Sequence, residues 1–410
     1  MSPCGYVRLA GIGCCALATL GAGCRSNSTL SSVDAATDLT DGSDSGVDPE
    51  TWAPPNLIAE RLSLFLWNQP LVDPGIEARV AAAASASDVA TIATDMLSDP
   101  RARDGIGAFF SWWLRLADLK TQPKDDPTEL LTADVRAAMT VEAPNFGAHV
   151  VLDGDAKYQT LMTAPYTFMN DVLAAHYGVQ GIMGSEMRQV PFDTSERIGL
   201  LGEAGVLARY AAESNPPWPP RRYWLMNDTL FCEMFGRVNA AITVTFVPDP
   251  TMLVRQQILD LTSSGTCPAC HTFVNPLSFP FLKFNTFGQF SEDGPGGPFD
   301  TSAVKPAGGI FPEEMSFADQ PDLVGQLVAR ADVRRCIVSR WIFFAVERPS
   351  SRDASPMTDV SMREASLDQA AAKFETSQGD LHELLIDITT TPAFLQSTVL
   401  MVSGTDAGID

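Results

Sequence analysis

The sequence predicts a mainly α-helical protein, with a multi-helical body and one loop-rich segment that carries a CxxCH motif. Three observations support this fold class. Apolar residues recur at helical spacing over most of the chain, few long runs alternate with period two, and the composition suits a protein with a buried core. The 410 residues are 45% apolar and only 19% charged, which excludes a largely disordered chain.

The charge balance is strongly acidic. The chain has 28 Lys and Arg residues against 50 Asp and Glu residues, which gives a formal net charge of -22. Sequence-independent nucleic-acid binding needs clustered cations that neutralise phosphates. We therefore expect no nucleic-acid partner.

Residues 1–24 have the pattern of an export signal. Arg8 is the only charge ahead of an apolar run over 9–20, which is too short to span a bilayer, and small residues then lead to Cys24. The ending Leu-Gly-Ala-Gly-Cys resembles a bacterial lipobox, although Leu20 lies one place too far upstream. We expect Cys24 to be lipidated and to become the mature N-terminus; plain secretion is the alternative.

Residues 25–55 are rich in Ser, Thr, Asp and Gly, with acidic side chains spaced among them. Such a stretch buries too little apolar area to order itself, so it is expected to be a solvated, acidic tether. We therefore expect a lipid-anchored protein of the bacterial cell envelope, at the outer membrane or cell surface. Without lipidation it would be periplasmic or secreted. No later segment has the apolar length to cross a membrane, so only the anchor would contact one.

The body is predicted to begin with a helix capped by Asn56. Near the other end, Asp380 and Glu383 have capping-box spacing ahead of a further helix. Two stretches interrupt the helices, the proline-rich run over 215–220 and the Gly-, Pro- and Asp-rich stretch over 288–312. Apolar spacing predicts helices over 76–97, 108–116, 130–151, 166–176, 197–212 and 323–345.

The breaks divide the body into four segments. These are an N-terminal helical segment over 56–122, a middle helical segment over 123–240, a CxxCH segment over 241–349, and a C-terminal helical segment and tail over 350–410.

The CxxCH motif comprises Cys267, Cys270 and His271. This motif is the attachment signature of c-type haem. Two cysteines three residues apart lie one helical turn apart, so both thiols can bond the vinyl groups on one porphyrin edge, and the adjacent histidine is then aimed at the iron as proximal ligand. The expected cofactor is covalent haem c.

Two other interpretations of the motif remain open. The two cysteines could form a small disulfide, or the three residues could bind zinc together with Cys232 or Cys336. If Cys24 takes lipid and the motif takes haem, Cys232 and Cys336 remain as an even pair. That pair is a disulfide candidate, and two separate buried thiols are the alternative.

The residues that follow the motif are apolar, and the sequence offers more than one candidate for the sixth iron ligand. Met315 and His176 are candidate sixth ligands, and an open position is the third possibility. Both motif cysteines and the His271 ring are expected to face one cavity that several phenylalanines line. These belong to a run of eight apolar residues after His271, namely Phe273, Val274, Leu277, Phe279, Phe281, Leu282, Phe284 and Phe287.

The sequence resembles the planctomycete and myxobacterial exported cytochrome-c-like proteins, which are described mostly as strings of domains of unknown function. The matching stretches are 58–67 (IAERLSLFLW), 96–101 (MLSDPR), 168–178 (FMNDVLAAHYG), 197–201 (RIGLL), the CxxCH motif with the residues after it, and 336–348. The resemblance implies a cytochrome-c-like segment over 241–349. Three positions that are usually acidic in this family are neutral here, namely Asn275, Leu282 and Asn285.

Two functions of different classes follow. The first is an exported monohaem electron-transfer protein whose acidic body faces an unknown, basic redox partner. The second is a surface binding or scaffold lipoprotein with a structural CxxCH site. A haem enzyme with an open iron position is a third hypothesis. No serine, cysteine or carboxylate constellation in the sequence supports a hydrolase.

Overall fold

The structure is mainly helical, as the sequence predicts. This computed structural model describes residues 47–213, 220–232, 249–309, 311–347 and 360–396. The predicted signal, Cys24 and most of the predicted tether lie outside these residues. Contacts divide the chain between Ser45 and Gly46, so all four predicted body segments lie in the same unit. No helix of the described part is both long and apolar enough to cross a membrane.

The N-terminal part consists of two 3-10 turns and four α-helices. The expected cap at Asn56 is wrong, because the helix starts one residue earlier, with Pro55 at the first position, where its missing N–H costs nothing. The helix expected over 76–97 is two helices, because Ser85 and Asp88 form a capping box that starts a new one. The elements are η1 (Pro49–Thr51), α1 (Pro55–Trp67), α2 (Pro74–Ala82), α3 (Ala86–Leu97), α4 (Ala102–Trp113) and η2 (Leu116–Lys120).

The middle part is built around the long helix α5 (Ala133–Leu152). The helix expected over 166–176 begins as a strand, because residues 166–169 pair with a second strand in an antiparallel ladder. Asn170 then caps the helix, and its side chain accepts from the Leu173 amide at 2.9 Å. The elements after α5 are α6 (Tyr158–Thr163), β1 (Tyr166–Met169), α7 (Asp171–Tyr177), β2 (Arg188–Pro191), η3 (Leu200–Gly202) and α8 (Ala204–Arg209).

The CxxCH segment contains more helix than expected. Loops occupy part of it, but the motif itself lies on a helix, and two α-helices and a 3-10 turn of the segment precede its first short strand; one further helix, α9, lies just before the segment. The elements are α9 (Pro220–Thr229), α10 (Val254–Thr262), α11 (Pro268–Ser278), η4 (Phe279–Phe281), β3 (Asp293–Gly294), β4 (Gly297–Pro298), β5 (Ala303–Lys305) and β6 (Met315–Phe317). Both strand pairs here are antiparallel, and Lys305 is paired with Met315.

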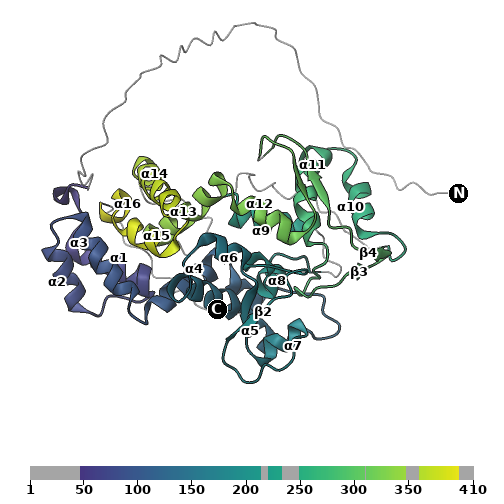
Figure 1. Cartoon of the computed structure of the whole chain (residues 1–410), viewed down its shortest axis with the longest axis horizontal. Coiled ribbons are helices and arrows are strands. Elements are labelled where there is room, and N and C mark those ends of the chain that lie inside the picture. Colours follow the sequence, from purple (N-terminus) through teal and green to yellow (C-terminus); the bar gives the residue numbers. More distant parts are fainter. Residues whose placement is uncertain (1–46, 214–219, 233–248, 310, 348–359, 397–410) are drawn as a thin grey trace, which may run out of the picture. The chain divides into compact units, whose positions relative to one another are not determined.

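The C-terminal helices return to the N-terminal ones. Figure 1 shows this group beside α1 and α3, and contacts join α1 to α13 and α3 to α15. At the centre of this packing, Phe109 stacks on Trp341 with ring centroids 3.4 Å apart. The group comprises α12 (Gln320–Val328), α13 (Ala331–Val346), α14 (Val360–Thr376), α15 (Leu381–Thr389) and α16 (Pro392–Leu395).

The predicted tether extends too far into the body. Trp52 Nε1 donates to the Val47 carbonyl at 3.0 Å, and the Ala53 amide donates to the Leu395 carbonyl at 2.7 Å. Ala53 is buried. These hydrogen bonds, together with the packing of Val47, Trp52 and Ala53 against the core, order this end of the stretch, which its polar composition did not indicate.

Candidate functional site

The CxxCH motif forms the first turn of α11. Cys267 precedes the helix, and Pro268 at the first position has the backbone angle that a helix needs. The Cys270 and His271 amides donate to the Cys267 carbonyl at 3.2 and 2.9 Å. The two cysteines are therefore one turn apart on one helix. Both are free thiols and both are half-buried.

The His271 ring is held by a side chain one turn further along α11. Its Nδ1 lies 2.8 Å from Oδ1 of Asn275, and the ring is half-buried. Asn275 is buried, and its Nδ2 donates to Oγ1 of Thr262, the last residue of α10, at 2.8 Å. Because Nδ1 is engaged, Nε2 is the ring nitrogen that remains for a metal.

Helix α9 packs against α11 and contributes two large polar side chains. Tyr223 is buried, and burial together with the nearby Cys270 thiol raises the pKa of its phenol. Arg222 is 1% exposed, and its Nη2 donates to the carbonyl of Asn285 at 2.8 Å. Its Nε and Nη1 have no hydrogen-bond partner among the described residues. Burial, followed by repulsion from Arg197, lowers the pKa of Arg222 to about 9.

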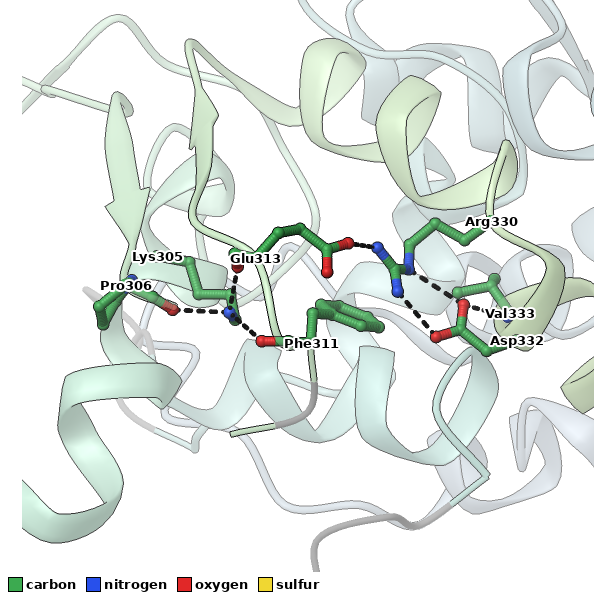
Figure 2. A network of polar contacts seen from close by, with 7 residues as sticks. All are labelled: Lys305, Pro306, Phe311, Glu313, Arg330, Asp332 and Val333. Carbon is green, nitrogen blue, oxygen red and sulfur yellow. Dashed lines mark hydrogen bonds and ion pairs between the residues drawn. The ribbon is translucent and has the colours of Figure 1, made fainter. Parts of the chain in front are cut away.

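The other flank of α11 rests on the β5–β6 hairpin. Lys305 is fully buried, and Figure 2 shows its ammonium group among three carbonyl oxygens, those of Pro306, Phe311 and Glu313, at 2.6, 2.8 and 3.0 Å. The same nitrogen lies 5.9 Å from the centre of the Phe273 ring on α11. The hairpin therefore holds this face of the helix with a buried cation whose three protons all have acceptors.

A second part of this network fixes the hairpin to α13. The Glu313 carboxylate contacts Arg330, whose Nε and Nη2 bond Asp332 at 3.0 and 2.9 Å (Figure 2). The Arg330 guanidinium also lies 4.0 Å from the centre of the Phe311 ring. The loop of the hairpin is thus tied to the start of α13.

The apolar run after the motif is not arranged as expected. Six of its eight residues are at most 4% exposed and pack into the core; these are Leu277, Phe279, Phe281, Leu282, Phe284 and Phe287. Only Phe273 and Val274 are half-buried on α11. Four of the five phenylalanines in the run, from which the lining of a haem cavity was expected, are therefore buried in the core, because η4 and the turn after it fold back into it.

Two cavities are described, and neither is lined by the CxxCH residues. One, of about 430 Å³, lies between the end of α1, α4 and α5, and includes Trp67 and Arg103. The other, of about 190 Å³, lies between α10 and the β3–β4 hairpin, and includes Arg255 and Asp300.

The two candidate sixth ligands lie in different surroundings. Met315 is buried on β6, the partner of the strand β5 that contacts α11. His176 is buried on α7, and its Nε2 donates to the Phe287 carbonyl at 2.9 Å. Burial lowers the pKa of His176. As an iron ligand His176 would have only Nδ1 available in this arrangement.

Cys232 and Cys336 form a disulfide, with Cα atoms 5.5 Å apart. The bridge joins the end of α9 to α13. It also removes both cysteines from the zinc set that would include one of them. Among the described residues, no three His, Cys, Asp or Glu side chains gather as a metal site.

The neutral residues at the three family positions have distinct structural roles. Asn275 bonds His271, as described above. Leu282 is 4% exposed in the core, where a carboxylate would be desolvated. Asn285 Oδ1 accepts from the amides of Phe287 and Gln289 at 2.9 Å each and so closes the turn after η4.

The side chains around the motif fit a covalently held haem in their donor chemistry. The two free thiols stand one turn apart, and the adjacent histidine has Nε2 available. Arg222 is a buried cation with unpartnered nitrogens on the helix that packs against α11. A haem carries two propionate carboxylates, which are the kind of group that such a guanidinium binds.

Sequence reasoning did not identify Thr262 or Tyr223 as neighbours of the motif, nor Arg222 as a buried cation on α9. The spacing of four residues between His271 and Asn275 was a usable signal, because residues at that spacing face each other on a helix. Nothing local marked Thr262 or Arg222, since the contact of Thr262 depends on how α10 packs against α11, and those of Arg222 on how α9 packs against the turn after η4.

Comparisons with known families match two adjacent parts of the body. Residues 55–179 match the family PSD4, described as a protein of unknown function (DUF1592). Residues 197–294, which include the CxxCH motif, match the family PSCyt3, described as a protein of unknown function (DUF1588). No curated protein and no solved structure matches the chain. Both matched families are domains of unknown function found in planctomycete cytochrome-c-like proteins, which fits the resemblance drawn from the sequence.

Proposed function

We propose that the chain is an exported, lipid-anchored, monohaem c-type cytochrome-like protein that acts in electron transfer. The observation that supports this most strongly is the first turn of α11. It presents two free thiols one turn apart and a histidine whose Nε2 is available. These are the side chains that c-type haem attachment requires.

The residues of the site would have separate tasks. The Cys267 and Cys270 thiols would each add across one haem vinyl group, so a C–S bond forms, the thiol proton moves to the neighbouring carbon, and no oxidant is consumed. His271 would ligate the iron through Nε2, and Arg222 would pair with a propionate. The haem supplies a one-electron iron couple. The net charge of -22 would attract a basic redox partner.

The test is expression with and without haem-attachment machinery. We expect a Soret band and a mass increase of one haem only with the machinery, and loss of both in the variant Cys267→Ser, Cys270→Ser. His271→Ala should keep some covalent haem but lose the native spectrum. The control His382→Ala on α15 should keep the native spectrum. A wild-type protein without haem under these conditions would refute the proposal.

The same samples test the sixth ligand. Met315→Ala should change the spectrum only if Met315 ligates the iron. If the wild-type protein binds cyanide or carbon monoxide readily, the sixth position is open, which favours a haem enzyme.

One observation favours a second candidate, a binding or scaffold lipoprotein with a structural motif. Most of the apolar run after His271 packs into the core rather than around an open cavity. For this candidate, replacing both Cys267 and Cys270 by Ser should alter thermal stability and leave the visible spectrum blank in every sample.

A further inference from the structure

A chain of three hydrogen bonds runs from α10 to the His271 ring. The Thr262 hydroxyl donates to the Ile258 carbonyl at 2.7 Å. Asn275 Nδ2 lies 2.8 Å from Thr262 Oγ1, and Asn275 Oδ1 lies 2.8 Å from His271 Nδ1. Thr262 and Asn275 are 6% and 3% exposed, so little water can compete for these bonds.

The direction of each bond follows from the first one. A hydroxyl has one proton, and Thr262 gives it to a carbonyl, which can only accept. Thr262 Oγ1 must therefore accept from Asn275, and this sets the Asn275 amide with its NH₂ group towards Thr262. The amide oxygen then faces His271, and because that oxygen cannot donate, the proton of the bond lies on Nδ1.

The consequence is a defined state of the imidazole. A neutral histidine with its proton on Nδ1 carries its lone pair on Nε2. Free histidine in water favours the opposite tautomer, with the proton on Nε2 and no lone pair there. The buried amide thus selects the form that can bind a metal through Nε2.

We propose that Asn275 and Thr262 are positioning residues that hold His271 in its Nδ1–H tautomer and so prepare Nε2 as an axial iron ligand, an inference that rests on the proposed haem function. An amide is a neutral acceptor. It supports the ligand less strongly than a carboxylate would, because hydrogen bonding to the second ring nitrogen raises the basicity of the ligand. Asn275 should therefore also set the reduction potential.

The tautomer can be measured in the haem-free protein. In two-bond ¹H–¹⁵N correlation spectra, with His271 assigned from His271→Ala, we expect Nδ1–H in the wild type. Asn275→Leu and Thr262→Val should shift His271 towards the Nε2–H tautomer. Thr262→Ser, which keeps the hydroxyl, should retain the wild-type tautomer. Thr272→Val is the matched control, because the Thr272 hydroxyl bonds the Pro268 carbonyl on the exposed side of α11. The proposal would be overturned if His271 carried its proton on Nε2 in the wild type. It would also be overturned if Asn275→Leu and Thr262→Val had the same His271 tautomer as the control.

The potential is measured in the haem-loaded protein. The midpoint potential should be highest in Asn275→Leu, intermediate in the wild type and lowest in Asn275→Asp. The control Thr272→Val should have the wild-type potential. A purely structural role for Asn275 would change stability but not produce this order. If the wild type takes up haem and the order is absent, the positioning role is refuted. If the wild type takes up no haem, the proposed function fails, and the tautomer measurement still decides the state of His271.

Discussion

Arg222 is a buried cation with no carboxylate partner among the described residues. Its side chain donates only to the carbonyls of Asn285 and Phe284, at 2.8 and 3.4 Å. Among the described residues, Nε and Nη1 are buried without an acceptor, so the charge lowers the stability of the fold while no anion is bound. A bound anionic group would reverse this cost.

We predict opposite effects of Arg222→Met in the two forms of the protein. In the haem-free protein the free energy of unfolding should rise by roughly 1 kcal/mol, because removing the desolvated charge outweighs the loss of two bonds to carbonyls. In the haem-loaded protein the same change should lower it. Urea titrations measure both, with Arg221→Met, at the exposed neighbour on α9, as the control. A loss of stability in the haem-free protein would contradict this prediction.

Between elements, a buried acid pair joins α5 to the start of α8. Thr167 on β1 lies 3.1 Å from Glu142 Oε1 and 3.3 Å from Glu203 Oε1. Tyr177 also donates to Glu142 Oε1, at 2.5 Å, whereas Glu203 Oε2 has no partner among the described residues. Glu142 is therefore the better stabilised anion, and Glu203 the better protonated acid.

Burial determines how this pair titrates. It raises the pKa of Glu142 to about 7. Burial and the neighbouring Glu142 charge raise the pKa of Glu203 well above its ordinary value. At neutral pH the pair therefore retains at least one proton. Glu142, Thr167 and Tyr177 lie in the first matched family segment and Glu203 in the second, so this proton helps to hold the two segments together.

The pair predicts a loss of stability as the pH rises. An unfolded glutamate titrates near pH 4.5. Burial raises the pKa of both folded carboxyls, so the folded state binds the proton more tightly; this contribution is fully present below pH 4.5 and is lost as the pH rises above it. Glu203→Gln, which mimics the protonated acid, should therefore stabilise the protein relative to wild type more at pH 8 than at pH 5.

Urea midpoints at the two pH values measure this difference. The control is Glu77→Gln on the exposed side of α2, which should behave alike at both. An equal effect of Glu203→Gln at pH 5 and pH 8 would show that Glu203 does not hold the proton.

The disulfide is the second link between distant elements. It joins Cys232 to Cys336 across a sequence separation of 104 residues and encloses α10, α11 and both hairpins of the CxxCH segment. Closing a loop of this length restricts the unfolded chain, and the chain-entropy model gives about 4.7 kcal/mol for this restriction.

We predict that the variant Cys232→Ser, Cys336→Ser loses about 2–4 kcal/mol in the free energy of unfolding. Wild-type protein in a reductant should lose a similar amount, while the variant should not respond to the reductant. Paired urea titrations with and without reductant measure this. A wild-type protein that the reductant leaves unchanged, with its thiols shown to be reduced, would be inconsistent with the bridge.

For the whole molecule, the predicted lipid anchor at Cys24 lies ahead of the described residues, which begin at Val47. Among the described residues no helix can cross a membrane, and the contacts of Val47, Trp52 and Ala53 connect this end to the folded body. A lipid on Cys24 would hold this acidic body at a membrane surface.

Cys24→Ala should move the protein from the detergent phase to the aqueous phase in a phase-separation assay. Cys15→Ala, within the apolar run of the signal, should leave it in the detergent phase. Intact-mass analysis of the extracted wild type should show acyl mass on Cys24. A mature chain that begins after Cys24 and carries no acyl group would exclude the anchor, although export would remain.

The sequence by itself determined the helical class, the helical spacing of most elements and the first turn of α11. These features depend on residues within four positions of each other, so periodicity and short motifs report them. The positions of Cys267, Cys270 and His271 on one turn follow from the same rule. The strand at 166–169 does not follow from this rule, because its pairing partner lies about twenty residues away along the chain.

Only the tertiary structure decided what surrounds the motif. It placed the Thr262 hydroxyl against the Asn275 amide, the Arg222 guanidinium against the Asn285 carbonyl, and most of the phenylalanine run inside the core. Each of these contacts joins residues on different helices or on a turn that folds back. Burial, an unpartnered charge and a selected tautomer are properties of such packing, and they have no periodic trace in the chain.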